Sequence, residues 1–162
     1  MACESIVRVA DVRDRAEVWR LFLHSHQDNG LFSLAPEKVD VFLNRLLMPE
    51  LIPDDDTGVR GVIGVIGPVG ELEALCGICI SDVWYTSEKH LADFLVFVDP
   101  ANRASDHASA LLHWMKLQSD LIGLPLLSGV VSSKRTEAKC RLFKRMFPKV
   151  GEYYLYSKQT SH

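Results

Sequence analysis

The chain has 162 residues and a formal net charge of −3 at pH 7, with 48% apolar and 24% charged residues. This length and composition fit one ordinary globular domain with a sizeable core, and we expect that domain to cover residues 1–162. The acidic balance argues against nucleic acid or an anionic membrane as the main partner, because both select basic surfaces.

The start of the sequence predicts the compartment. Met-Ala-Cys-Glu-Ser has neither the basic start nor the apolar run of a secretory signal peptide. The longest apolar runs are too short to span a bilayer. We therefore expect a cytoplasmic protein without a membrane partner.

The first third of the chain predicts one strand and two helices. Residues 5–11 alternate between polar and apolar, which is typical of a short edge strand. Asp11 can then cap a helix that continues to about His26. Pro36 favours the start of a second helix, and residues 48–58 predict a loop with two prolines and an acidic run.

The rest of the chain predicts a meander followed by a β-α-β unit. Residues 59–87 form a predicted hairpin around a Gly-Pro-Val-Gly turn, and 90–100 a strand that is apolar enough for burial on both faces. The later predicted elements are a helix over 103–121, a strand over 126–131, a helix over 133–147 and a closing strand over 151–158. This order predicts an α/β domain with a mixed, twisted sheet of about six to seven strands and about four helices.

The cysteines and histidines do not predict a metal site. Cys76 and Cys79 form a C-x-x-C pair inside a predicted strand, with no second such pair and no His pair nearby. We expect them to be small buried hydrophobic side chains. No two histidines have metal-binding spacing, so we expect no metal cofactor.

Residues 94–112, FLVFVDPANRASDHASALL, resemble a motif of the GCN5-related N-acetyltransferase (GNAT) superfamily. The family has a strand ending in V-x-P, and then Q/R-x-x-G-x-G/A at the start of a helix. Arg103 matches the first position of that motif and Ala108 the last, whereas Asp106 replaces the central glycine. The same loop, Arg-x-Ser-x-His-Ala, also resembles those of GNAT proteins encoded in phage genomes.

Two further stretches extend the resemblance over nearly the whole chain. Residues 138–154, AKCRLFKRMFPKVGEYY, are similar to the family's A-x-x-L-Y-x-x-x-G-F-x-x-x-G-x-Y ending, with one residue fewer. Residues 6–22, IVRVADVRDRAEVWRLF, are similar to its first strand and helix. The resemblance implies a single GNAT-like domain that uses acetyl-CoA as substrate and an amine as acceptor, either a small molecule or a protein.

The resemblance also implies where coenzyme A would lie. The unpaired amides at a helix start attract a pyrophosphate, so its contacts would be Arg103, Ala104, Ser105, Asp106, His107, Ala108 and Ser109. The pantetheine would pair with the preceding strand, at Leu95, Phe97 and Val98. Arg103 is either a phosphate ligand or a solvated residue of the helix start. Asp106 either repels the phosphate or caps the helix, and we expect the cap.

The implied reaction needs a base and a proton donor. Asp93 is the candidate catalytic base, with Asp82 and Glu88 as weaker candidates and a structural carboxylate as the alternative for each. The family often has a tyrosine that protonates the leaving thiolate, but this position is Phe143, which has no proton to donate. The candidate replacements are Tyr153, Tyr154 and Tyr156.

Two functions therefore stay open. The first is a coenzyme A-dependent N-acetyltransferase. The second is a non-catalytic GNAT-fold module that binds a partner or builds a structure, such as a phage virion component, and the lost glycines and Phe143 favour it. Because edge strands pair readily, a homo-oligomer or a larger protein assembly is a further expectation.

Overall fold

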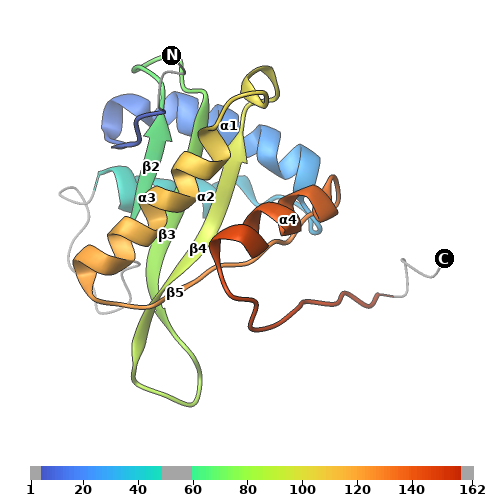
Figure 1. Ribbon diagram of the computed structural model, residues 1–162. Coiled ribbons are helices and arrows are strands. Elements are labelled where there is room, and N and C mark those ends of the chain that lie inside the picture. Colours follow the sequence, from blue (N-terminus) through green and yellow to red (C-terminus); the bar gives the residue numbers. More distant parts are fainter. Residues whose placement is uncertain (1–4, 49–59, 158–162) are drawn as a thin grey trace.

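The computed structural model describes residues 5–48 and 60–157, which form one mixed sheet between two layers of helices (Figure 1). The sheet has five strands in the order β1-β2-β3-β4-β5. They are β1 (Arg8–Val9), β2 (Gly61–Ile66), β3 (Ala74–Asp82), β4 (Lys89–Val98) and β5 (Leu126–Leu127). The pairs β1–β2, β2–β3 and β3–β4 are antiparallel, and the pair β4–β5 is parallel. The predicted α/β class and mixed sheet are confirmed.

Two helices cover each face of the sheet. They are α1 (Arg15–Asn29), α2 (Pro36–Leu47), α3 (His107–Ile122) and α4 (Thr136–Met146), with the short 3-10 helices η1 (Val12–Asp14) and η3 (Pro100–Asn102). One buried cluster lies between the sheet and α1 with α2, and contains Leu21, Leu43 and Leu75. The other lies between the sheet and α3 with α4, and contains Leu91, Leu111 and Met115. About four helices were predicted, and the described residues contain four.

A capping box ends the first strand and starts the helical segment. The Asp11 carboxylate accepts the Arg13 amide (2.9 Å), and the Asp14 carboxylate accepts the Asp11 amide (3.0 Å). Asp14 is fully buried and accepts both ends of the Arg8 guanidinium, at 2.7 and 2.8 Å. This hydrogen-bonded partner lowers the pKa of Asp14. Asp11 caps the helical segment, as predicted. Because η1 begins directly after it, the strand predicted over 5–11 is shortened to two residues.

A β-bulge lies in the middle of β4. Asp93 pairs with Ile78 and Leu95 with Gly77, so Phe94 is one extra residue in the strand. Phe94 and Leu95 both face the cluster under α1 and α2. The Phe94 ring lies over Gly77, where an added Cβ would be 2.0 Å from Cζ of that ring.

Two strand predictions in the C-terminal third are wrong, and the start of one predicted helix is shifted by a few residues. The helix expected from Arg103 begins at His107, because η3 and a turn in which the Ser105 amide donates to the Asn102 carbonyl (3.1 Å) come first. The strand expected over 126–131 pairs at Leu126–Leu127 alone. Residues 151–157 contain no strand, although 151–158 was predicted as one. The described sheet therefore has five strands, and the predicted six to seven is wrong.

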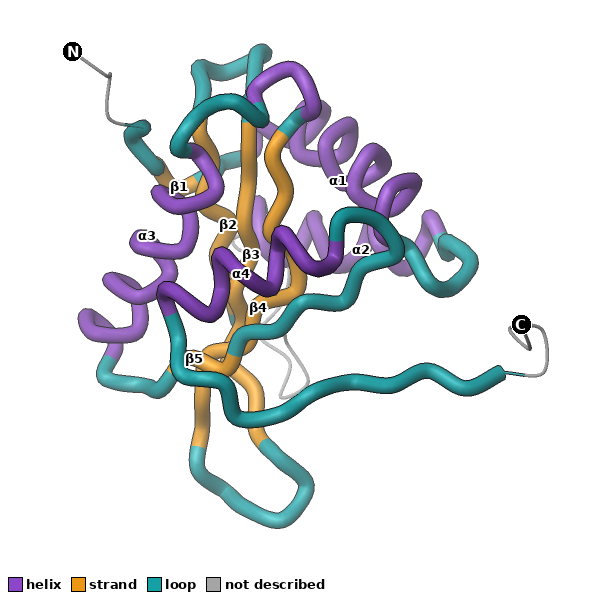
Figure 2. The backbone as a smooth tube through the Cα atoms, turned by 45° about the vertical axis from the view of Figure 1, so that its right-hand side comes forward, coloured by secondary structure: helices purple, strands orange, loops and turns teal. Residues whose placement is uncertain are grey.

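After α4 the chain leaves the body of the molecule. Figure 2 shows this segment as a long extended tube that crosses near β5 and then runs away from both helical layers. Its apolar side chains, among them Val150 and three tyrosines, are exposed. No helix within residues 5–48 and 60–157 has the length and apolar character needed to cross a membrane. The loop predicted over 48–58 lies outside the described residues apart from Met48.

Candidate functional site

The edge of β4 that faces β5 is paired over only a short length. Leu91 pairs with Leu126 and Ala92 with Leu127, and the Leu91 amide donates to the Pro125 carbonyl (2.8 Å). Because a bulge bends its strand, β4 leaves the line of β5 just after this point. In the described part of the chain, no strand pairs with this edge of β4 from residue 93 to residue 98.

Asp93 stands where the two strands separate. Its carboxylate accepts the Gly129 amide, at 3.1 Å, from the segment that follows β5. Burial raises the pKa of Asp93 above its ordinary value. The buried Ser128 hydroxyl lies close enough to lower this pKa in part, although it does not reach hydrogen-bond geometry. A carboxylate with a raised pKa is suited to general base chemistry, which is the role predicted for Asp93.

The predicted pantetheine residues lie on this open edge, but on different faces. Leu95 and Phe97 are buried under α1 and α2, whereas Val98 packs on the α3 side. The Val98 carbonyl points to the open edge and accepts a hydrogen bond from Arg103 Nε (3.4 Å). A ligand could therefore use the backbone of residues 95–98, and their side chains belong to the core.

Asp106, the residue before α3, makes no side-chain cap to the helix. The Asp106 carboxylate accepts the Ser5 hydroxyl instead, so the predicted capping role of Asp106 is wrong. In the described segments, the amides of Ala108 and Ser109 have no hydrogen-bond partner. Asp106 therefore does not compete with an anion for these two amides.

His107 is held in the core at the same helix start. It is buried, its Nε2 donates to Glu73 Oε2 (2.5 Å), and its Nδ1 contacts the Ser5 hydroxyl (2.6 Å). Ser105 Oγ donates to the Asn102 carbonyl (2.5 Å) and accepts the His107 amide (3.3 Å). These hydrogen bonds fix the loop, and Arg103, Ala104, Ser105 and Asp106 are its exposed residues, whereas His107 is buried.

Arg103 is paired within the protein. Its guanidinium donates to the Asp28 carboxylate near the end of α1, at 2.9 Å, and lies over the Phe97 ring at 5.7 Å. This ion pair lowers the pKa of Asp28. The contact spans 75 residues of sequence, so the motif around Arg103 gives no sign of it.

Sequence reasoning missed further positive charges around Asp28. Lys134 Nζ lies 3.6 Å from its carboxylate, and Arg135 and Lys139 follow at the start of α4. Burial and the nearby charges of Arg103 and Arg135 lower the pKa of Lys139. We call Arg103, Lys134, Arg135 and Lys139 the basic cluster. The run K-R-x-x-x-K at a helix start was its sequence signal.

Among the candidate proton donors, Tyr153 lies beside the segment whose Gly129 amide donates to Asp93. Phe143 packs against Phe147, with ring centroids 5.8 Å apart, in the cluster under α3 and α4. The Tyr153 ring lies beside Gly129, 3.6 Å from where a Cβ of that residue would be. Tyr154 and Tyr156 are exposed. The weaker base candidates, Asp82 and Glu88, are both exposed, and Asp82 forms an ion pair with Lys89 at the end of the sheet.

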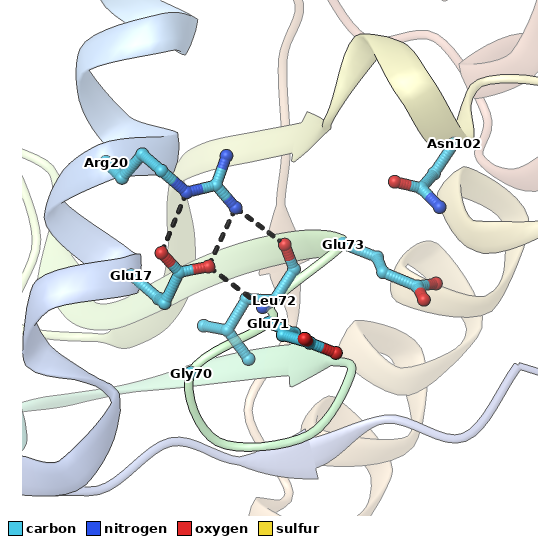
Figure 3. A pocket seen from close by; sticks show the side chains of 7 residues that line it. All are labelled: Glu17, Arg20, Gly70, Glu71, Leu72, Glu73 and Asn102. Carbon is cyan, nitrogen blue, oxygen red and sulfur yellow. Dashed lines mark hydrogen bonds and ion pairs between the residues drawn. The ribbon is translucent and has the colours of Figure 1, made fainter.

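A separate hollow of about 470 Å³ lies on the α1 side of the loop before α3 (Figure 3). Its lining residues are Glu17, Arg20, Gly70, Glu71, Leu72, Glu73 and Asn102. Arg20 donates to Glu17, to Asp99 (2.7 Å) and to the Leu72 carbonyl (2.8 Å), and it lowers the pKa of both carboxylates. The surplus of carboxylates makes this hollow unsuitable for a phosphate. None of the predicted site residues lines it.

Comparison with solved structures identifies the fold. A probable acetyltransferase matches with 17% identity and a TM-score of 0.68, over 97% of this chain and 99% of its own. A ribosomal-protein-alanine N-acetyltransferase from Brucella melitensis biovar Abortus 2308 matches with 14% identity and a TM-score of 0.65, over 94% and 97%. The chain has the GNAT fold.

An aminoglycoside acetyltransferase from an uncultured soil metagenomic sample, in complex with sisomicin, has this GNAT fold too. It matches with 11% identity and a TM-score of 0.62, over 94% of this chain and 96% of its own. No protein-family model and no curated protein match the sequence. The GNAT fold is thus shared at identities too low to transfer an acceptor or a catalytic residue.

Proposed function

We propose that this chain is a coenzyme A-dependent N-acetyltransferase that moves the acetyl group of acetyl-CoA to an amine. One observation carries the proposal: the unpaired edge of β4 from residue 93 to residue 98 leads to the start of α3, where the amides of Ala108 and Ser109 have no partner among the described residues. An extended amide-containing chain can hydrogen-bond to such an edge, and a pyrophosphate can accept from the amides at the helix start.

Charge supports the same placement. Within the described residues, Arg103 and Lys134 pair with Asp28, whereas Lys139 of the same basic cluster donates to Asn29 and to Ser132. A ligand with several phosphate charges would add the missing negative charge. Arg103 would exchange Asp28 for the ligand or contact both. This local charge differs in sign from the chain as a whole, whose net charge is −3.

Asp93 would act as the base. In the proposed reaction the amine nitrogen loses a proton to the Asp93 carboxylate, directly or through water, and attacks the thioester carbonyl carbon. The carbon–sulfur bond then breaks, and the thiolate takes up a proton from solvent or from a nearby tyrosine. A thiol with a pKa near 8.5 is a tolerable leaving group, so Phe143 in place of a tyrosine is compatible with turnover.

Binding of acetyl-CoA tests the proposal. At a concentration about 100-fold above Kd, a ligand adds about 2.7 kcal/mol to the free energy of unfolding, which raises Tm by about 5–10 °C for a domain of this size. Arg103→Glu should abolish this rise. Lys116→Glu, which makes the same charge change at an exposed position of α3, should retain it.

Two results would contradict the proposal. One is an unchanged Tm of the unaltered chain in millimolar acetyl-CoA. The other is an equal loss of the ligand-induced rise in both variants, because a general charge effect rather than Arg103 would then explain binding. The Tm of each variant without ligand shows whether it is still folded.

A further inference from the structure

Ser128 carries a buried hydroxyl that has no partner. Within residues 5–48 and 60–157, two buried side-chain polar atoms lack a hydrogen-bond partner, and they are Ser128 Oγ and His24 Nδ1. Leaving a buried hydroxyl unpaired lowers the stability of the folded chain. A native structure that retains such a group often uses it for binding or for chemistry.

Ser128 stands at the point where β4 and β5 separate. It comes directly after β5, and the next residue, Gly129, donates its amide to the Asp93 carboxylate at 3.1 Å. The Ser128 hydroxyl lies close enough to lower the pKa of Asp93 in part, without reaching hydrogen-bond geometry. Because a serine hydroxyl changes direction by rotation about a single bond, it can turn toward this carboxylate or away from it.

The carboxylate beside Ser128 faces the same helical layer as Phe143. Asp93 pairs with Ile78 across β3 and β4, and residues directly opposite each other in a sheet point to one face. Both Ile78 and Phe143 belong to the cluster under α3 and α4. Phenylalanine has no proton to donate, so a hydroxyl next to Asp93 lies on the face of the sheet where a donor is missing.

We propose, on the basis of the acetyl transfer proposed above, that the Ser128 hydroxyl is the proton donor to the departing thiolate. As the amine nitrogen attacks the thioester carbon, its proton passes to the Asp93 carboxylate. When the carbon–sulfur bond breaks, the Ser128 hydroxyl gives its proton to sulfur and regains one from the Asp93 carboxylic acid. The products are an amide and a thiol, and both side chains return to their starting protonation states.

The titratable thiols near Asp93 do not compete for this role. Burial raises the pKa of Cys76 to about 12 and also raises that of Cys79, and the charge of Asp93 adds to both shifts. Cys76 lies in the core, and Cys79 pairs with Ala92, one residue before Asp93, so that it points to the opposite face. Both thiols stay protonated at neutral pH, so neither adds a step to the pH profile there.

Tyr153 is the competing hydroxyl. Its ring lies beside Gly129, but its side chain is 80% exposed. A donor that is exposed to this extent offers the thiolate little that water does not. The buried Ser128 hydroxyl, in contrast, can deliver a proton where solvent does not reach.

Thiol release from acetyl-CoA, with benzylamine as the probe acceptor, tests the donor in the full chain. Ser128→Ala should lower kcat about 10²-fold, with an unchanged KM for acetyl-CoA. We expect this lower end of the range for acid catalysis because a thiolate leaves readily without help. Ser128→Thr keeps a hydroxyl and should retain most of kcat. The control Ser119→Ala removes a hydroxyl that binds the Leu124 carbonyl and should leave kcat unchanged.

The pH profile of kcat is a readout that a merely structural serine would not change. Because the Ser128 hydroxyl lowers the pKa of Asp93 in part, the midpoint of the rise of kcat should move to higher pH in Ser128→Ala and return in Ser128→Thr. Far-UV circular dichroism and Tm show that each variant is folded.

Three results would overturn the role of Ser128, and they separate it from the proposed function. Turnover by the unaltered chain with an equal kcat in Ser128→Ala would support acetyl transfer and exclude Ser128 as the donor. A larger loss of kcat in Tyr153→Phe than in Ser128→Ala would assign the proton to the tyrosine. No thiol release by the unaltered chain would contradict acetyl transfer itself, and the proton path with it.

Discussion

Asp28→Asn is the sharpest test of the basic cluster, because the side chain keeps its size and loses only its charge. In the structure Asp28 holds Arg103 at 2.9 Å and Lys134 at 3.6 Å. A ligand phosphate must compete with this carboxylate for the same guanidinium. Removing the charge should therefore strengthen acetyl-CoA binding.

The exposure of the pair sets the size of this effect. Two unit charges about 4 Å apart attract by about 1 kcal/mol in water and about 4 kcal/mol at an effective dielectric constant of about 20. The side chains of Arg103 and Asp28 are 33% and 28% exposed, and pairs that water reaches usually contribute about 1 kcal/mol or less. A gain of about 1 kcal/mol corresponds to a Kd about fivefold lower.

Isothermal titration calorimetry with acetyl-CoA, at low and at high ionic strength, measures this change. We expect the fivefold difference at low salt and a smaller one at high salt, because mobile ions screen the exposed part of the cluster. Asp120→Asn is the matched control, since it makes the same charge change at an exposed position near the other end of α3. If Asp28→Asn binds no tighter than this control, Arg103 does not contact the ligand as proposed.

Three further predictions concern the catalytic base and the fold. Asp93→Asn should lower kcat about 10²- to 10⁴-fold without unfolding the chain. It should also remove the rise of kcat with pH that a base of raised pKa produces. An unchanged pH–rate profile would exclude Asp93 as the base. Asp14→Ala should lower the free energy of unfolding by about 1.5–3 kcal/mol in urea titrations, because it removes the buried carboxylate that accepts from Arg8, while the partly exposed guanidinium keeps the Gly67 carbonyl. Since the folded-state pKa of Asp14 lies below its ordinary value, this stabilisation is complete above about pH 4 and is lost as pH falls further, so the variant should show a weaker acid dependence. Gly77→Ala should cost about 1–3 kcal/mol, because its Cβ would overlap the Phe94 ring, and Phe94→Leu in the same chain should recover part of this loss.

Local chemistry made much of the fold predictable. The hairpin around the Gly-Pro-Val-Gly turn, the cap at Asp11 and the proline at residue 36 depend on neighbours within a few positions, and each prediction holds in the structure. The closing strand was wrong for the opposite reason. Tyr153 to Tyr156 have the composition of a strand, but a strand also needs a partner edge, which a local pattern does not specify.

The candidate site shows the same limit. The motif around Arg103 located the loop and the start of α3 to within a few residues, because sequence signals for turns and helix starts are local. The pairing of Arg103 with Asp28 and the use of Ser5 as the partner of Asp106 join residues 75 and 101 positions apart. Contacts this distant depend on the packed fold, so the predicted cap at Asp106 was wrong and the ion pair was missed.

The bulge at Phe94 has a consequence for how this sheet tolerates changes in length. Deleting Phe94 would leave Asp93 opposite Ile78 and Leu95 opposite Gly77, so every remaining side chain of β4 would keep its face. The deletion would straighten the strand, however, and let β4 continue alongside β5 beyond Ala92. The unpaired edge is thus tied to a one-residue insertion in an otherwise regular sheet, and closing it by this deletion would also take the Phe94 ring away from Phe42 and Gly77 in the core under α1 and α2.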